Sequence, residues 1–182
     1  SIPPQKHFKL LKKPIPYDRP EPNSGSLKFG LANVRSLNNK LSETKSFLIK
    51  ENIDVFAVTE TWLKDHHTNG HILSQLNYGL LRSDRTRCNG GGVAMFIRSS
   101  FVYNEICMLA TDCFELIVID LFVNEDKIRI IVVYLVPSST IDNISDLVEV
   151  LSLHVCVDFP CLLMGDFNLP MIDWISAKSD HS

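Results

Sequence analysis

Two long apolar runs separated by three polar residues constrain the fold of this 182-residue chain more than any other feature. Residues 114–123 read FELIVIDLFV, residues 127–136 read KIRIIVVYLV, and Asn-Glu-Asp lies between them. Isoleucine, valine and leucine fill both runs, which is typical of sheet strands, and a connection of this length is that of a hairpin. The sequence therefore predicts an antiparallel pair of strands over 114–136.

The remaining segments predict sheets covered by helices. Apolar residues recur at helical spacing within 36–52 and 140–155, and Thr140 and Asp142 are alternative N-caps of the second helix. Strand-length apolar runs lie at 27–34, 53–63, 78–84, 91–98 and 159–167. This order predicts an α/β fold in which parallel and antiparallel strand pairs occur together.

The first 26 residues differ in composition from the rest of the chain. They hold six of the nine prolines and a basic cluster of Lys6, Lys9, Lys12 and Lys13. Proline at this density disfavours both helices and strand pairing, so residues 1–26 are interpreted as an extended tail or linker. The lysines are either a solvated part of that linker or a patch for phosphate binding or nuclear import.

Composition limits the classes of function. The net charge of −3 gives no overall attraction for nucleic acid, so any attraction must come from local basic patches. Five scattered cysteines without a C-x-x-C pair predict reduced, mostly buried thiols and an intracellular location. No run approaches the ~18 apolar residues of a membrane span, so no membrane partner is expected. Because the chain begins with Ser1, we expect a processed chain or a fragment of a longer reading frame.

Polar residues stand just beyond four of the predicted strands. Asn33 follows LKFGLA, Glu60 follows DVFAVT, and Tyr134 follows IRIIVV. Asp166 and Asn168 follow CLLMG. Ligands of helix-covered sheets bind beyond strand ends, where loops converge. We predict that these five residues form one site.

Each of the five residues also has a purely structural interpretation. Asn33, and Asp166 with Asn168, suit turns. Glu60 follows a buried apolar strand, so it requires a partner, which is either another side chain or a metal. Tyr134 suits a core position with a satisfied hydroxyl.

Taken together, the five residues suit metal-assisted hydrolysis of a phosphodiester. Mg²⁺ takes oxygen ligands, usually one or two carboxylates completed by water and phosphate, and Glu60 is the expected ligand. Asp166 is expected to orient or deprotonate the attacking water. Asn33, Asn168 and Tyr134 are expected to donate hydrogen bonds to a phosphate whose charge rises in the transition state. The predicted cofactor is Mg²⁺ or Mn²⁺.

Five ordered motifs make the chain resemble a known superfamily. They are NVRSL at 33–37, TETWL at 59–63, RSDR with GGGVAMFIR within 82–98, VVYLVPSS at 132–139 and GDFNLPMIDW at 165–174. Their order and spacing are similar to those of the endonuclease/exonuclease/phosphatase superfamily, and within it to the apurinic-type endonuclease domain of non-LTR (LINE-like) retrotransposons. Residues 27–182 are therefore interpreted as one such domain.

The resemblance implies a deoxyribonuclease-like, four-layered αββα sandwich with a divalent metal near the strand ends. It implies nicking of chromosomal DNA in the nucleus to prime reverse transcription, within a longer polyprotein that carries a reverse transcriptase. Asn33 matches the family's first-strand asparagine, and Glu60 its metal-binding glutamate. Tyr134 matches a phosphate-contacting tyrosine, although YLVP departs from the usual Tyr-Arg-Pro-Pro. Asp166 and Asn168 match the GDFN motif.

The end of the chain departs from the family pattern. Members continue after GDFN with another helix, further strands and a closing SDH whose histidine is needed for catalysis, whereas eight residues follow Trp174 here. These include Ser179, Asp180 and His181, which match the closing motif either by chance in a truncated chain or as the true ending after an internal deletion. In both cases we expect the second sheet to be incomplete at its C-terminal side.

Two functions of different class are consistent with these motifs. One is a metal-dependent DNA endonuclease domain. The other is a catalytically inactive, truncated relic that binds at most nucleic acid or protein, because missing strands leave a central strand unpaired. A third interpretation, a relative acting on sugar or lipid phosphates, is less favoured by TETWL and GDFNLPMIDW.

Overall fold

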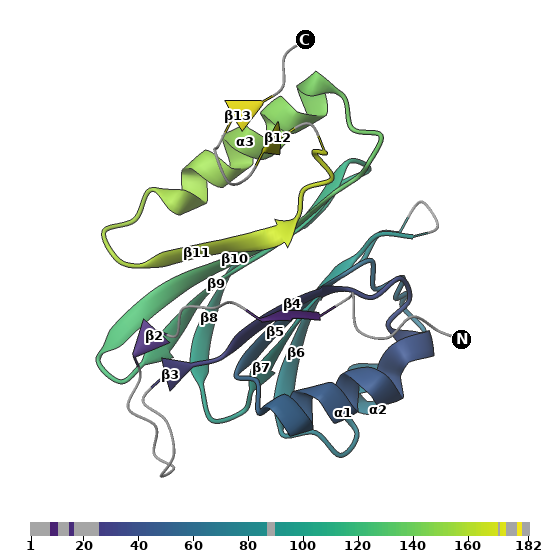
Figure 1. Ribbon diagram of the computed structural model, residues 1–182, viewed down its shortest axis with the longest axis vertical. Coiled ribbons are helices and arrows are strands. Elements are labelled where there is room, and N and C mark those ends of the chain that lie inside the picture. The colour runs from purple at the N-terminus through teal and green to yellow at the C-terminus, as the bar shows by residue number, and fades with distance from the viewer. Residues whose placement is uncertain are drawn as a thin grey trace.

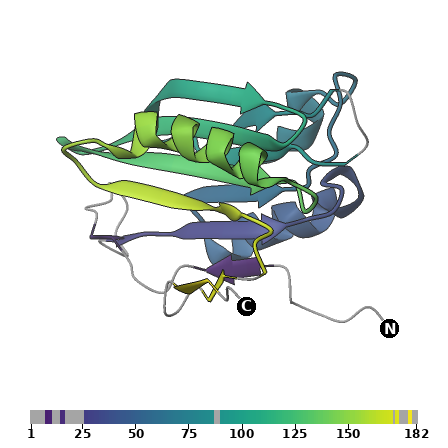
Figure 2. The ribbon, with the colours of Figure 1, turned by 90° about the horizontal axis from the view of Figure 1, so that it is seen from above.

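Two β-sheets lie face to face, with α1 and α2 outside the first sheet and α3 outside the second (Figure 1, Figure 2). The computed structural model describes residues 8–10, 15–16, 26–86, 90–170, 172–173 and 178–179. The α/β class and the layered arrangement of two mixed sheets flanked by helices are confirmed.

The first sheet has the strand order β1-β4-β5-β7-β6. Its members are β1 (Phe8–Leu10), β4 (Phe29–Asn33), β5 (Val55–Thr59), β6 (Tyr78–Ser83) and β7 (Val93–Arg98). β4 and β5 are parallel because η1 (Asn38–Lys40) and α1 (Leu41–Glu51) connect them, and the other pairs are antiparallel. α1 and α2 (Asn69–Leu73) cover the outer face.

The second sheet has the strand order β11-β10-β9-β8. Its members are β8 (Val102–Ala110), β9 (Phe114–Val123), β10 (Asp126–Leu135) and β11 (Cys161–Asp166). β10 and β11 are parallel, with α3 (Ile141–Val155) as the crossover. Two short pairs complete the described elements: β2 (Ile15–Pro16) with β3 (Ser26–Leu27), and β12 (Ile172–Asp173) with β13 (Lys178–Ser179).

The predicted hairpin is the centre of the second sheet. β9 and β10 pair from Phe114 opposite Leu135 to Val123 opposite Asp126, so the turn consists of Asn124 and Glu125. Asn124 has φ +55°, a conformation that asparagine tolerates in tight hairpin turns. The strand run therefore begins one residue earlier, at Asp126, than the apolar pattern predicts.

The saturated apolar runs reflect burial on both faces of the strands. The core between the sheets contains, among others, Val55, Met95, Ile117, Ile119 and Val132, all fully buried. Because successive side chains alternate, Leu116 and Val118 face the other way and pack with Leu147 of α3. On the first sheet, Phe56 and Phe96 likewise pack outward with Leu48 of α1.

The second predicted helix begins at a capping box. The Asn143 backbone N–H donates to Thr140 Oγ1 at 3.3 Å, and the Thr140 backbone N–H donates to Asn143 Oδ1 at 3.0 Å. This reciprocal pair satisfies two N–H groups that the first turn leaves without partners. Of the two predicted caps, Thr140 is therefore the cap and Asp142 lies in the first turn.

Two expectations differ from the structure. β8 has no counterpart among the predicted strands: none of its residues is buried, and Asn104 and Glu105 interrupt its apolar residues, so it lacks the apolar run of a buried strand. Within residues 1–26, β1 pairs antiparallel with β4, and β2 pairs antiparallel with β3, so the expectation of no strand pairing is wrong there. Most of that segment lies outside the described residues.

The cysteines confirm one expectation and correct another. Cys107, Cys113, Cys156 and Cys161 are free, as predicted, but none of these four is buried: two are half-buried and two are exposed. Cys88 lies outside the described residues. None of the described helices is both long and apolar enough to cross a membrane.

The second sheet was expected to be incomplete at its C-terminal side. Within the described residues, β11 is an edge strand of this sheet. Ser179 lies in β13, whereas Asp180 and His181 are outside the described residues. The interpretation of these three residues as a closing motif therefore stays a prediction.

Gly165 provides a stability test of the β10–β11 pairing. A β-carbon at this position would lie 2.1 Å from the carbonyl oxygen of Val133, a backbone atom that cannot move aside without disturbing the pairing. We expect Gly165→Ala to lower the free energy of unfolding by about 1–3 kcal/mol, the range for overpacking, as measured by urea denaturation.

Gly70→Ala is the matched control for this substitution. No atom lies within 4 Å of a β-carbon at Gly70, and the residue is in α2. Alanine there should leave the stability unchanged or raise it by up to about 1 kcal/mol. A Gly165→Ala protein as stable as the Gly70→Ala protein would contradict the pairing.

Candidate active site

The strand ends that were predicted to carry the site meet at one edge of the two sheets. Asn33 is the last residue of β4 and pairs with the last residue of β5, which Glu60 follows directly. In the second sheet, Tyr134 of β10 lies beside Asp166 of β11 and beside Glu115 of β9. The parallel pairs β4–β5 and β10–β11 each deliver their carboxyl ends to this edge.

The side-chain amide of Asn33 joins the two sheets. Its Nδ2 atom donates to Glu60 Oε1 at 2.6 Å and to Asp166 Oδ2 at 2.8 Å. Asp166 is 133 residues further along the chain. The Oδ1 atom of Asn33 is buried and has no hydrogen-bond partner among the described residues. One amide thus holds two carboxylates close together and leaves its own oxygen available.

Backbone hydrogen bonds fix the loop that carries Glu60. The N–H of Ser36 donates to Glu60 O at 2.9 Å, and the N–H of Trp62 donates to Gly91 O at 3.0 Å. Glu60 and Trp62 have φ of +53° and +54°, a left-handed region that such residues rarely adopt. Strained backbone of this kind persists only where the surroundings over-determine it, and it is concentrated at functional sites.

Asn168 closes a turn around Asp166. Its backbone N–H donates to Asp166 Oδ1 at 3.3 Å, and its Nδ2 atom donates to Leu135 O at 2.6 Å. The first of these bonds is typical of turns at aspartate. The turn interpretation is therefore confirmed, and the same turn orients the Asp166 carboxylate toward Asn33.

Tyr134 is buried among charges. Burial, followed by the negative charge of Glu60, raises the pKa of Tyr134 to about 12, while the positive charge of Arg85 acts in the opposite direction. Asp166 and Glu115 raise this pKa further. At neutral pH the hydroxyl is therefore protonated and can donate a hydrogen bond, next to Asp166.

A buried ion pair at the same edge was not predicted. Arg85 Nε donates to Glu115 Oε1, and the two side chains are 8% and 0% exposed. Burial raises the pKa of Glu115, and the adjacent Arg85 opposes this rise. The available signal was Glu115 itself, a carboxylate inside an apolar run, which requires a partner as Glu60 does at the end of its strand.

The five predicted residues are thus brought together. Asn33 contacts both Glu60 and Asp166, Asn168 bonds to Asp166, and Tyr134 lies beside Asp166. The amides of Asn33 and Asn168 are engaged with protein oxygens, so their donation to a phosphate stays a prediction.

The donor set fits a hard divalent cation. Two carboxylates that share one amide repel each other, and the buried, unpartnered Oδ1 of Asn33 is a third oxygen beside them. Among the described residues, no group of three or more His, Cys, Asp or Glu forms a metal cluster. A sparse set of oxygens completed by water and phosphate is the arrangement that Mg²⁺ prefers.

Sequence comparison identifies the family. A family model described as Endonuclease/Exonuclease/phosphatase matches residues 30–180. The chain therefore belongs to the endonuclease/exonuclease/phosphatase family, whose members include nucleases and phosphatases and generally depend on a divalent metal. No curated protein matches the chain in sequence.

Three solved structures illustrate the range of similar proteins. D. rerio TDP2 complexed with a single-strand DNA product has 17% identity and TM-score 0.58, and the alignment covers 79% of this chain and 61% of that chain. The endonuclease domain of TRAS1, a telomere-specific non-LTR retrotransposon, has 12% identity and TM-score 0.60, with coverage of 78% and 60%. The mannosyl-6-phosphatase Bt3783 of Bacteroides thetaiotaomicron has 14% identity and TM-score 0.60, with coverage of 79% and 66%.

These comparisons establish the fold and no finer property. The identities are low, and the chain spans between 60 and 66% of the length of the three structures. The three are a DNA complex, a nuclease domain and a sugar phosphatase, so similarity of fold does not select a substrate.

The pKa of Tyr134 predicts a loss of stability at high pH. Between pH 10, the ordinary pKa of tyrosine, and about pH 12, the folded state keeps a proton that the unfolded state has released. Stability therefore falls as the pH rises through this window, by about 1.4 kcal/mol per pH unit. Urea denaturation at several pH values should show this fall in the wild type.

Tyr134→Phe removes the titrating group and is the comparison for this measurement. The variant should lose less stability than the wild type over the same pH window, and the difference isolates Tyr134 from other tyrosines. Equal pH dependence of the two proteins would mean that Tyr134 is not buried beside the carboxylates.

Proposed function

We propose that the chain is a metal-dependent endonuclease domain that hydrolyses a phosphodiester bond of DNA. The observation that carries the proposal is the contact of Asn33 with both Glu60 and Asp166, because it brings two carboxylates from different sheets to one point. A structural role alone does not require two half-buried like charges to share one amide. Family membership supports hydrolysis of a phosphate ester.

In this proposal each of the five residues has a distinct role. Glu60 would hold the cation, with the Asn33 carbonyl oxygen beside it, and the bound cation would supply charge neutralisation for the phosphate. Asp166 orients or deprotonates the attacking water, and Asn33 and Asn168 keep its carboxylate aligned. Tyr134 donates its O–H to a phosphate oxygen, and its raised pKa keeps that proton in place at neutral pH.

DNA is the proposed substrate. Support comes from the DNA product in the TDP2 structure and from the likeness to the TRAS1 endonuclease domain. The motifs TETWL and GDFNLPMIDW, which resemble those of retrotransposon endonucleases, point the same way. On this basis we further propose that the domain nicks target DNA in the nucleus and is part of a longer polyprotein with a reverse transcriptase.

A second candidate is an inactive relic of such a domain. The observation that favours it is the edge position of β11 among the described residues, together with Leu163, which is 40% exposed on that strand. An edge of this kind exposes backbone and apolar surface. The two candidates make opposite predictions about hydrolysis by the folded chain.

Nicking of supercoiled plasmid tests the proposal. We expect the wild-type chain to convert supercoiled to relaxed plasmid in Mg²⁺ or Mn²⁺, and EDTA to abolish this conversion. Glu60→Gln and Asp166→Asn each remove one charge at nearly constant volume. Each should lower the rate by about 100-fold or more, as loss of an electrostatic or proton-transferring group does.

The controls are matched isosteric substitutions on α3. Glu149 and Asp146 are exposed residues of this helix, on the outer face of the second sheet, so Glu149→Gln and Asp146→Asn should retain the wild-type rate. A folded wild-type chain that does not nick DNA would support the relic instead. Hydrolysis of sugar phosphates without nicking would support the phosphatase alternative.

A further inference from the structure

Arg85 is a positively charged residue near the candidate active site. The five predicted residues include no such charge. It follows β6 by two residues, and its Cζ atom lies 5.8 Å from the centroid of the Tyr134 ring. Tyr134 is the register partner of Asp166. Arg85 therefore flanks the proposed hydrolytic residues on the side of β6.

Two contacts hold the guanidinium in position. Its Nε donates to Glu115, which is fully buried on β9 and also accepts a hydrogen bond from the Gly92 backbone. On its other side lies Gly91, where a β-carbon would be 2.7 Å from the Arg85 Cζ. The same glycine accepts the N–H of Trp62 from the Glu60 loop, so one segment braces both Arg85 and the loop.

The guanidinium has hydrogen-bonding capacity left over. Its Nη2 atom is buried without a partner among the described residues. A charged donor in this state is costly, and an anion would relieve it. The side chain is more than nine-tenths buried, yet it lines a pocket of about 400 Å³.

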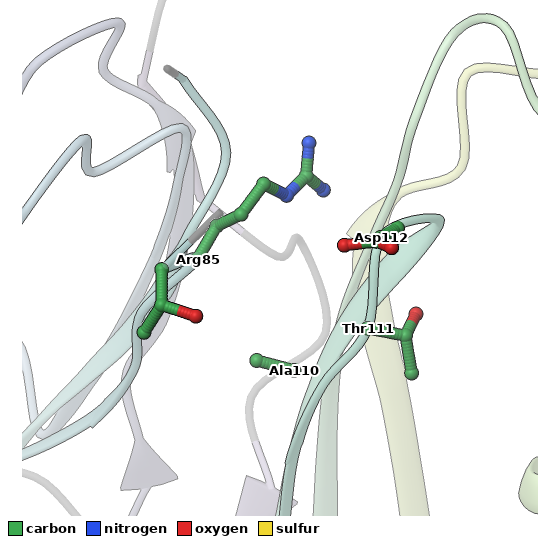
Figure 3. A pocket seen from close by; sticks show the side chains of 5 residues that line it. Arg85, Ala110, Thr111 and Asp112 are labelled. Atoms are coloured by element: carbon green, nitrogen blue, oxygen red, sulfur yellow. The ribbon is translucent and has the colours of Figure 1, made fainter. Parts of the chain in front are cut away.

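The pocket lies between the two sheets. Figure 3 shows the Arg85 side chain on one wall of the pocket and Ala110, Thr111 and Asp112 on the opposite wall, with the Thr111 side chain turned away from Arg85; Thr86 also lines the pocket. The Thr86 hydroxyl is a further potential donor, whereas the Thr111 hydroxyl already donates to Phe114 O at 2.9 Å. The negative charge of Asp112 would keep a bound anion on the Arg85 side of the pocket.

We propose that Arg85 binds a DNA backbone phosphate adjacent to the phosphate that is hydrolysed. Glu115 is the residue that positions the Arg85 side chain. The inference rests on the proposed function. A planar guanidinium matches phosphate oxygens with paired N–H groups. A site that contains Glu60 and Asp166, in a chain of net charge −3, needs such a local cation to hold a polyanion.

The test uses a neutral pair, because removing one partner alone leaves a buried charge and can unfold the protein. Arg85→Gln/Glu115→Gln replaces the ion pair by two amides that can bond to each other. Affinity for a short DNA duplex is measured by fluorescence anisotropy over a series of NaCl concentrations, in EDTA so that nothing is hydrolysed. The negative slope of log K against log [NaCl] should become shallower by roughly 0.9, the value for one lost phosphate contact. Affinity should be about 5- to 20-fold weaker.

The chain offers a matched control pair within the second sheet, which also carries Glu115. Arg129 Nε donates to Asp120 Oδ1 at 2.7 Å, and both side chains are largely buried. These residues lie further along the same hairpin, five positions from Tyr134 and Glu115. Arg129→Gln/Asp120→Asn should leave the slope unchanged.

Arg85→Lys is a second variant, which keeps the charge and loses the paired N–H groups, and we expect an unchanged slope with about 3- to 10-fold weaker binding.

The outcomes separate this inference from the proposed function. A shallower salt dependence in Arg85→Gln/Glu115→Gln, with no change in the control pair, supports the phosphate contact. This holds even if the wild type hydrolyses no DNA and the endonuclease proposal fails. The inference is overturned by an unchanged slope in a folded Arg85 pair, by equal slope changes in both pairs, or by a wild type that does not bind the duplex. If the Arg85 pair does not fold, wild-type affinity in Arg85→Lys overturns it.

Discussion

The side-chain amide of Asn33 connects the two sheets at the edge that carries the candidate active site. The Asn33 side chain bonds at 2.6 Å to Glu60 on its own sheet and at 2.8 Å to Asp166 on the other. This contact requires β4 and β11, which belong to different sheets, to end next to each other. The register of each sheet is therefore tied to the position of a single side chain.

The surrounding backbone is shaped to keep this contact. Glu60 and Asn168 both have positive φ, and backbone or side-chain hydrogen bonds hold each of them there. Gly91 and Gly92 also have positive φ and leave no room for a β-carbon against Arg85 and Thr61. Strain at several adjacent positions is stable only when packing elsewhere compensates for it, and the doubly buried strands β5, β9 and β10 supply that packing.

The parts that could be predicted from sequence are those with a local signal. Saturated apolar runs indicated β5, β9 and β10, and polar residues at strand ends indicated the five residues that the structure brings to one edge. β8 gave no such signal, since one of its faces is exposed to solvent and its place depends on pairing with β9. The Arg85–Glu115 pair needed knowledge of which sheets face each other, because its members are 30 residues apart and on different sheets.

The proposal that Glu60 holds a cation beside Asn33 Oδ1 and Asp166 is tested most directly by a crystal structure grown in Mn²⁺, with anomalous scattering recorded at the manganese edge. We expect one anomalous peak bonded to a Glu60 oxygen, beside Asp166 and Asn33 Oδ1. Glu60→Gln crystals under the same conditions should lose it. Ordered density for the three side chains without a peak, or a peak bonded elsewhere, would contradict the assignment.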